Sequence, residues 1–214
     1  MAPARDRRKG VLLAELALGY ALIEITVWAP NPPQRTLFWI SAGWFLASAV
    51  MAKLRGERLG FQRPPLRMAA LTVLLTILLA AGMGAMAARL GTLHGLYGVR
   101  APLLHSGGYL LWSVVQQYIQ QGYFFSRIER FTAHGVLASF LTALLFSLAH
   151  LPNPVLTPIT FLGGWVLSEL FRRYRSVWPL AVAHGLMGLA IAVCVPDHIH
   201  HHMRVGLGYL RYPK

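Results

Sequence analysis

WSVVQQYIQQGYFFSRIER, residues 112–130, is the stretch that decides the fold of this chain. It lies in an apolar part of the sequence, yet it carries four glutamines within six residues. At helical spacing Gln116 stacks on Gln120 and Gln117 on Gln121, which predicts a polar ladder down one side of a helix. Amides inside a membrane-spanning helix need hydrogen-bonding partners, because hydrocarbon offers none. We therefore expect polar side chains from other apolar segments to face this ladder.

The composition is that of an integral membrane protein. Of the 214 residues, 56% are hydrophobic and 13% are charged, and the mean hydropathy is +0.50. Soluble domains contain about 25% charged residues, roughly twice this share. The net charge of +13 does not indicate a nucleic-acid partner, because the basic residues stand between apolar runs and not on one polar segment. The partner that the composition predicts is the lipid bilayer.

Seven apolar runs follow one another, each long enough to cross the hydrocarbon core. They span residues 11–29, 37–54, 68–90, 103–125, 133–151, 155–171 and 177–195. The first follows a basic segment, residues 1–10, and we interpret it as a retained span because it lacks a signal-peptide cleavage pattern. The sequence thus predicts an all-α, polytopic membrane helical bundle of about seven transmembrane helices. It forms one domain, residues 11–195, before a histidine-rich tail, residues 196–214.

The basic residues predict the orientation of this bundle. With a cytoplasmic N-terminus, 14 Lys and Arg residues lie on the cytoplasmic side and 6 on the opposite side. Cytoplasmic loops carry the excess of basic residues in membrane proteins. We therefore expect a multi-pass protein with a cytoplasmic N-terminus, in a bacterial inner membrane.

Acidic residues inside the spans are the first candidates for function, since buried charge is unfavourable. Glu15 and Glu24 point to roughly opposite sides of the first span, so each is expected to pair within the bundle. Glu169 is expected to pair with Arg172 or Arg173. A transporter that relays ions through the glutamates and histidines is a remote alternative, because no paired broken helices occur in corresponding halves.

Histidines are the second group of candidates. His150 and His184 stand in separate apolar runs beside small residues, and are the expected partners of the glutamines. They could begin a site for zinc or another divalent metal, but the sequence supplies no clear third ligand and no HExxH motif. The tail carries four more histidines, which either bind a transition metal or form an exposed polar cap, and we favour the cap. These are His198, His200, His201 and His202.

Three short motifs in this order resemble the CAAX protease and bacteriocin-processing (CPBP) family of intramembrane endopeptidases. Its members carry Glu-Glu-x-x-x-Arg, Phe-x-x-x-His and His-x-x-x-Asn or Asp. Here the second is intact as Phe146-Ser-Leu-Ala-His150, and the third keeps His184. The first aligns with Gln116-Gln117-Tyr-Ile-Gln-Gln121, and the CPBP-like core covers about 103–195. The resemblance implies an endopeptidase that acts on a membrane-embedded or lipidated, for example prenylated, peptide.

The departures from these motifs bear on the chemistry. In the family the first glutamate activates water, and glutamine has no lone pair basic enough to do so at neutral pH. Gln121 lacks the charge of the arginine it replaces, and Gly188 lacks the donor of the third motif. Two hypotheses follow: a divergent peptidase, in which a histidine could serve as the base, and a non-catalytic protein that binds a membrane partner. The candidate catalytic residues are Gln116, Gln117, Gln121, His150 and His184, and the candidate substrate pocket is Phe146, Gln120 and Gly188.

Overall fold

The computed structural model describes residues 2–96 and 102–212, and side chains from residue 9 and again from residue 106. Within these ranges all regular secondary structure is helical, which confirms an all-α membrane bundle. The helices are α1 (Ala2–Trp28), α2 (Pro33–Leu54), α3 (Leu66–Leu90), α4 (Pro102–Gln117), the π-helix η1 (Tyr118–Phe125), α5 (Ser126–Ile128), α6 (Gly135–Leu148), α7 (Leu156–Tyr174), α8 (Trp178–Cys194), α9 (Asp197–His200) and α10 (Gly206–Leu210).

The helices differ in their capacity to cross a bilayer. In the described residues three meet the length and hydropathy expected of a span: Lys9–Trp28, Pro33–Leu54 and Leu66–Leu90. The helix in the fifth predicted run, α6, has only 14 residues, or about 21 Å, against roughly 30 Å of hydrocarbon. It ends at Leu148 because the chain turns before the Leu-Pro-Asn-Pro segment, so His150 lies in a turn.

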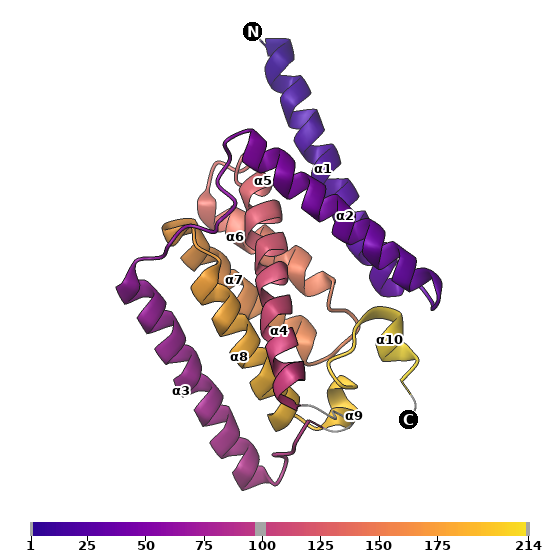
Figure 1. Cartoon of the computed structure of the whole chain (residues 1–214), viewed down its shortest axis with the longest axis vertical. Coiled ribbons are helices and arrows are strands. Elements are labelled where there is room, and N and C mark those ends of the chain that lie inside the picture. The colour runs from indigo at the N-terminus through magenta and orange to yellow at the C-terminus, as the bar shows by residue number, and fades with distance from the viewer. Residues whose placement is uncertain (1, 97–101, 213–214) are drawn as a thin grey trace.

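The bundle is organised around the continuous helical segment α4–η1–α5. Figure 1 shows α4 in the middle of the molecule, with α1 and α2 crossing on one side and α3 at the opposite edge. α4 and α3 both contact α8, while α6 packs against α7 and also against η1. The glutamine segment thus lies between α8, which carries His184, and α6, which ends two residues before His150.

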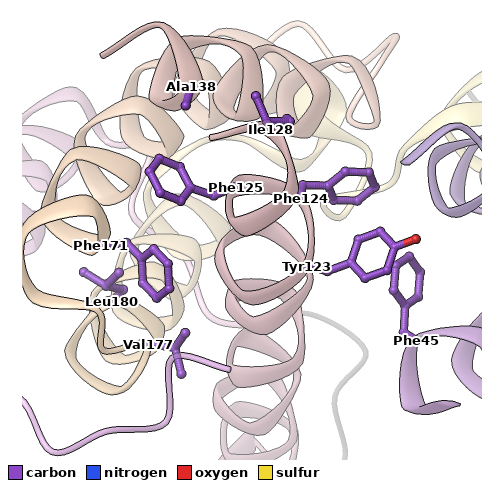
Figure 2. Packing of buried hydrophobic residues seen from close by; sticks show 9 residues of the cluster. All are labelled: Phe45, Tyr123, Phe124, Phe125, Ile128, Ala138, Phe171, Val177 and Leu180. Atoms are coloured by element: carbon purple, nitrogen blue, oxygen red, sulfur yellow. The ribbon is translucent and has the colours of Figure 1, made fainter. Parts of the chain in front are cut away.

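A cluster of aromatic side chains fixes η1 in this position. Tyr123 and Phe124 point toward Phe45 of α2, whereas Phe125 points to the other side, toward Phe171 of α7 (Figure 2). The Phe125 and Phe171 rings meet edge to face with centroids 5.6 Å apart, a favourable aromatic geometry. π-helical turns are rare, and those that occur are often found at functional sites. This distortion therefore makes η1 a candidate functional segment.

The C-terminal tail is folded onto the end of the bundle. The Asn153 side chain donates to the carbonyls of His200 and Arg204, both at 2.9 Å, and the Gly206 N–H donates to the Leu151 carbonyl at 2.7 Å. His200 is fully buried, with Nε2 2.8 Å from the Val195 carbonyl. The expected exposed polar cap is therefore wrong for His200, because these hydrogen bonds draw the tail against the loop after α6.

Candidate functional site

Gln117 lies at the centre of a buried hydrogen-bond network that links three helices. Its Nε2 is 2.9 Å from Gln120 Oε1 and 3.0 Å from Nδ1 of His184 on α8. Gln121 Nε2 is 3.4 Å from Gln117 Oε1, and Gln120 Nε2 is 3.2 Å from the Gly164 carbonyl on α7. The three glutamines are 0–1% exposed. Their hydrogen bonds run to one another, to a backbone carbonyl and to one histidine, while Gln121 Oε1 is buried without a partner among the described residues.

The Gly164 carbonyl sets the direction of every hydrogen bond in this network. A carbonyl only accepts, so the nearby Gln120 atom must be the Nε2 donor, and Gln120 Oε1 must face Gln117. Gln117 then presents Nε2, whose second hydrogen points to His184 Nδ1. Nδ1 of His184 therefore accepts, and the proton of the neutral ring is on Nε2.

His150 has the opposite tautomer. Its Nδ1 is 2.6 Å from the Phe146 carbonyl one turn earlier in the chain. Because that oxygen only accepts, His150 Nδ1 carries the proton, and Nε2 of the neutral ring carries a lone pair. One imidazole thus keeps a basic nitrogen and the other keeps an N–H donor.

Phe146 holds the two histidines in one place. Its ring meets the His150 ring with centroids 4.7 Å apart and the His184 ring at 5.6 Å, both edge to face. Phe146 thus contacts both histidines, and His184 also contacts Gln117, while a pocket shared by all of these residues stays a prediction. The structure brings together Gln117, Gln120, Gln121, Phe146, His150 and His184.

The glutamine ladder differs from its predicted form. Gln120 bonds to Gln117, not to Gln116, while the predicted pairing of Gln117 with Gln121 is present. Gln116 is half-buried, and its Oε1 is buried without a hydrogen-bond partner in the described structure. The cause is η1, which begins at Tyr118 and changes the helical spacing on which the prediction was based.

A cavity of about 30 Å³ adjoins the network between α1, η1 and α6. Gln120 and Phe146 lie on its wall, and the remaining lining is apolar apart from Tyr20 and Thr142. A cavity of this size has room for a water molecule or a small part of a side chain. It lies on the side of Gln120 that faces the first helix.

The acidic residues of the spans have structural partners. Arg127 Nε is 2.9 Å from Glu15 Oε2, Trp28 Nε1 is 3.1 Å from Glu24 Oε2, and Arg172 is 2.8 Å from Glu169. The Glu169 pairing was predicted. Within residues 2–96 and 102–212, no group of three or more His, Cys, Asp and Glu residues has a geometry that could hold a metal ion.

Two residues of the site were absent from the sequence prediction. Gly164 supplies the carbonyl that anchors Gln120, and an added Cβ there would lie 2.9 Å from Gln120 Nε2. Tyr109 fills the space beside Gly188, whose added Cβ would lie 2.6 Å from Tyr109 Cε1. The only signal for such contacts was the presence of glycines in apolar segments, which allow helices to approach closely.

Comparison with known proteins supports the motif assignment. Residues 103–190 match the family model described as type II CAAX prenyl endopeptidase Rce1-like. The matched segment includes the positions of all three motifs and ends in α8. No curated protein and no solved structure gives a significant match.

Proposed function

We propose, on the premise that residues 103–190 belong to the Rce1-like family of type II CAAX prenyl endopeptidases, that this integral membrane protein is a slow intramembrane endopeptidase. Its substrate class is a prenylated or otherwise membrane-embedded peptide, in keeping with the name of the family. The bacterial inner membrane is its proposed location, with the basic residues between spans supporting a cytoplasmic N-terminus. The proposal assigns catalysis to the histidines, because Gln116 and Gln117 replace the usual glutamates.

The opposite tautomers of the two histidines are the observation that carries this proposal. His150 Nε2 is a base with a free lone pair, since the Phe146 carbonyl holds the Nδ1 proton. His184 Nε2–H is a donor, since Gln117 occupies the Nδ1 lone pair. Hydrolysis of an amide needs one group of each kind.

The reaction can be written with these two groups alone. His150 Nε2 takes a proton from water as the water oxygen bonds to the carbonyl carbon of the scissile peptide. The carbonyl electron pair moves to its oxygen, which accepts a hydrogen bond from His184 Nε2–H. The tetrahedral intermediate then collapses, the C–N bond breaks, and protonated His150 gives its proton to the leaving nitrogen. The products are a carboxylic acid and an amine.

Gln117 is a positioning residue in this scheme. Its amide cannot remove a proton, but it holds Nδ1 of His184 and so keeps the Nε2 proton available. An amide in place of a carboxylate also leaves the network uncharged, which suits residues that are 0–1% exposed. The absence of a carboxylate base accounts for the low expected rate.

The test is cleavage of a synthetic farnesylated peptide, with three residues after the modified cysteine, by purified protein in liposomes. We expect wild type to release the tripeptide slowly. His150→Asn should lower the rate about 10²–10⁴-fold, the usual contribution of a general base, and His184→Ala about 10²–10³-fold. His198→Asn, at an exposed tail position, is the matched control and should cleave like wild type.

A second candidate function is a protein that binds the same peptide without cutting it. It is favoured by the Gln117 amide, whose oxygen and both hydrogens are already used within the protein. Saturable binding of the peptide, with release of tripeptide at the level of His150→Asn, would establish this function and reject the peptidase. Failure to bind and to cleave would reject both.

A further inference from the structure

Gly188 stands one helical turn after His184, on the same face of α8. It is buried, and a Cβ built on it would collide with the hydroxyl oxygen of Tyr109 and lie 2.6 Å from Tyr109 Cε1. A side chain at position 188 and the Tyr109 ring therefore compete for one volume. In this chain the Tyr109 ring occupies that volume.

The contact is part of a close approach between α4 and α8. A Cβ at Gly185 would lie 2.5 Å from Leu110 Cδ2 and 3.1 Å from Ser113 Oγ. Farther along α4, Gln117 reaches His184. Along one interface, therefore, α4 provides Tyr109 beside Gly188 and Gln117 beside His184.

No hydrogen bond joins the Tyr109 hydroxyl to a described side chain or backbone group, and the residue is partly buried. A phenol is both a donor and an acceptor, so this hydroxyl is free to hydrogen-bond to a bound ligand. The hydroxyl lies where a side chain at position 188 would begin, and Cβ bonds on a helix tilt toward its N-terminus, which here is the direction of His184.

We propose that Tyr109 is a second oxyanion donor of the site, whose hydroxyl acts together with His184 Nε2–H on the carbonyl oxygen of the bound peptide. This role rests on the proposed endopeptidase function. Tyr109 thus supplies from α4 the polar group that Gly188 does not supply from α8. Gly188 is required because it leaves room for the ring.

Tyr109→Phe is the decisive variant, because it removes the hydroxyl and keeps the ring. With the farnesylated peptide in liposomes, we expect kcat to fall about 10²–10³-fold, as for loss of one oxyanion-hole donor, with KM and melting temperature close to wild type. Wild-type cleavage together with unchanged kcat in Tyr109→Phe would overturn this role and leave the endopeptidase function intact. A wild type that does not cleave would overturn both.

A second pair of variants tests the shared volume first by stability and then by cleavage. Gly188→Asn alone should lower the melting temperature in detergent, because the new side chain meets the Tyr109 ring. Adding Tyr109→Ala should recover most of the lost melting temperature, and should raise cleavage above that of Tyr109→Ala alone, since the carboxamide brings a donor to the same place. Equal melting temperatures for wild type and Gly188→Asn would contradict the arrangement.

Discussion

The helical segment α4–η1–α5 carries two polar regions whose buried side chains are stabilised in different ways. At Gln117 the groups are uncharged and hydrogen-bond to one another within the bundle. Ten residues later, Arg127 forms a charged pair with Glu15 of α1, with side chains 9% and 19% exposed. The Arg127 guanidinium also lies 3.8 Å from the centre of the Tyr123 ring.

The difference goes with exposure and with access to further charges. Glu15 keeps some exposure, and Arg55, which is 53% exposed, lies 3.9 Å from it. A full charge is tolerable near such an end of a helix but is unfavourable deeper in a membrane bundle. The ion pair joins α1 to the core, whereas the amide network holds Nδ1 of His184. The same segment therefore carries the anchoring pair and the candidate site at separate places.

We expect the largest effect on stability from removing the charge of Glu15, which together with Arg127 forms the anchoring pair. Glu15→Gln leaves the Arg127 guanidinium without its main partner, and removing one partner of a buried pair is destabilising by about 3–5 kcal/mol. Because Glu15 is partly exposed, we expect about 2–3 kcal/mol in the free energy of unfolding, measured in mixed micelles. Glu57→Gln breaks the exposed pair with Arg130 and should change stability by less than about 1 kcal/mol. Equal losses in the two variants would contradict an anchoring role for Arg127.

Gly164→Ala should disturb the uncharged hydrogen-bond network around Gln117 and leave the anchoring pair intact. The new methyl group would lie 2.9 Å from Gln120 Nε2 and 3.4 Å from Phe146 Cδ1, so Gln120 must leave the Gly164 carbonyl. Overpacking of this kind is destabilising by about 1–3 kcal/mol. NMR of protein labelled with ¹⁵N-histidine should also show a changed protonation pattern of the His184 ring nitrogens.

Gly163→Ala is the matched control for that variant. A Cβ at Gly163 has no atom within 4 Å, so the change adds helix propensity without a collision. We expect stability equal to wild type or higher by up to about 1 kcal/mol, with an unchanged His184 spectrum. If both alanines shift stability in the same direction, the network does not depend on the Gly164 carbonyl.

The membrane fold and the approximate place of the site were predictable from sequence. Runs of apolar residues indicate burial in lipid directly, and the order of the Phe146, His150 and His184 motifs predicted the family resemblance that residues 103–190 also show. Both histidine rings contact Phe146, which the sequence analysis placed with them among the candidate site residues.

The finer geometry depends on tertiary contacts that no local pattern encodes. The π-helical turn arises where Tyr123, Phe124 and Phe125 pack in different directions, and it redirects Gln120 from Gln116 to Gln117. The role of Gly164 lies in a backbone carbonyl, which a sequence does not display. His200 was expected at the surface as part of a polar tail, whereas its side chain is buried, and the distant Asn153 donates a hydrogen bond to its carbonyl.

The smallest expected effect is a pH dependence of the stability of the tail. It comes from His200, a buried histidine outside the predicted spans. His200 Nε2 donates to the Val195 carbonyl, and His200 Nδ1 accepts from the Met203 N–H. Burial lowers the pKa of His200 below its ordinary value of 6.5, partly opposed by that carbonyl and by Asp197. The unfolded tail thus binds the proton more readily, so the contribution of His200 to stability is present above pH 6.5 and falls as the pH drops below it.

His94 contributes to the pH dependence of stability with the opposite sign. A hydrogen bond to the same Val195 carbonyl raises its pKa, so its contribution is present below pH 6.5 and is lost as the pH rises through the raised value. In hydrogen exchange of the protein in nanodiscs, we expect protection of residues 196–212 to decrease from pH 7 to pH 5, because charging His200 requires loss of the Met203 hydrogen bond. His94→Asn should steepen this decrease, and His198→Asn should leave it unchanged. Protection that rises on acidification would show that the tail is held by charged histidines, as the anchoring pair is held by Arg127, and not by a neutral His200.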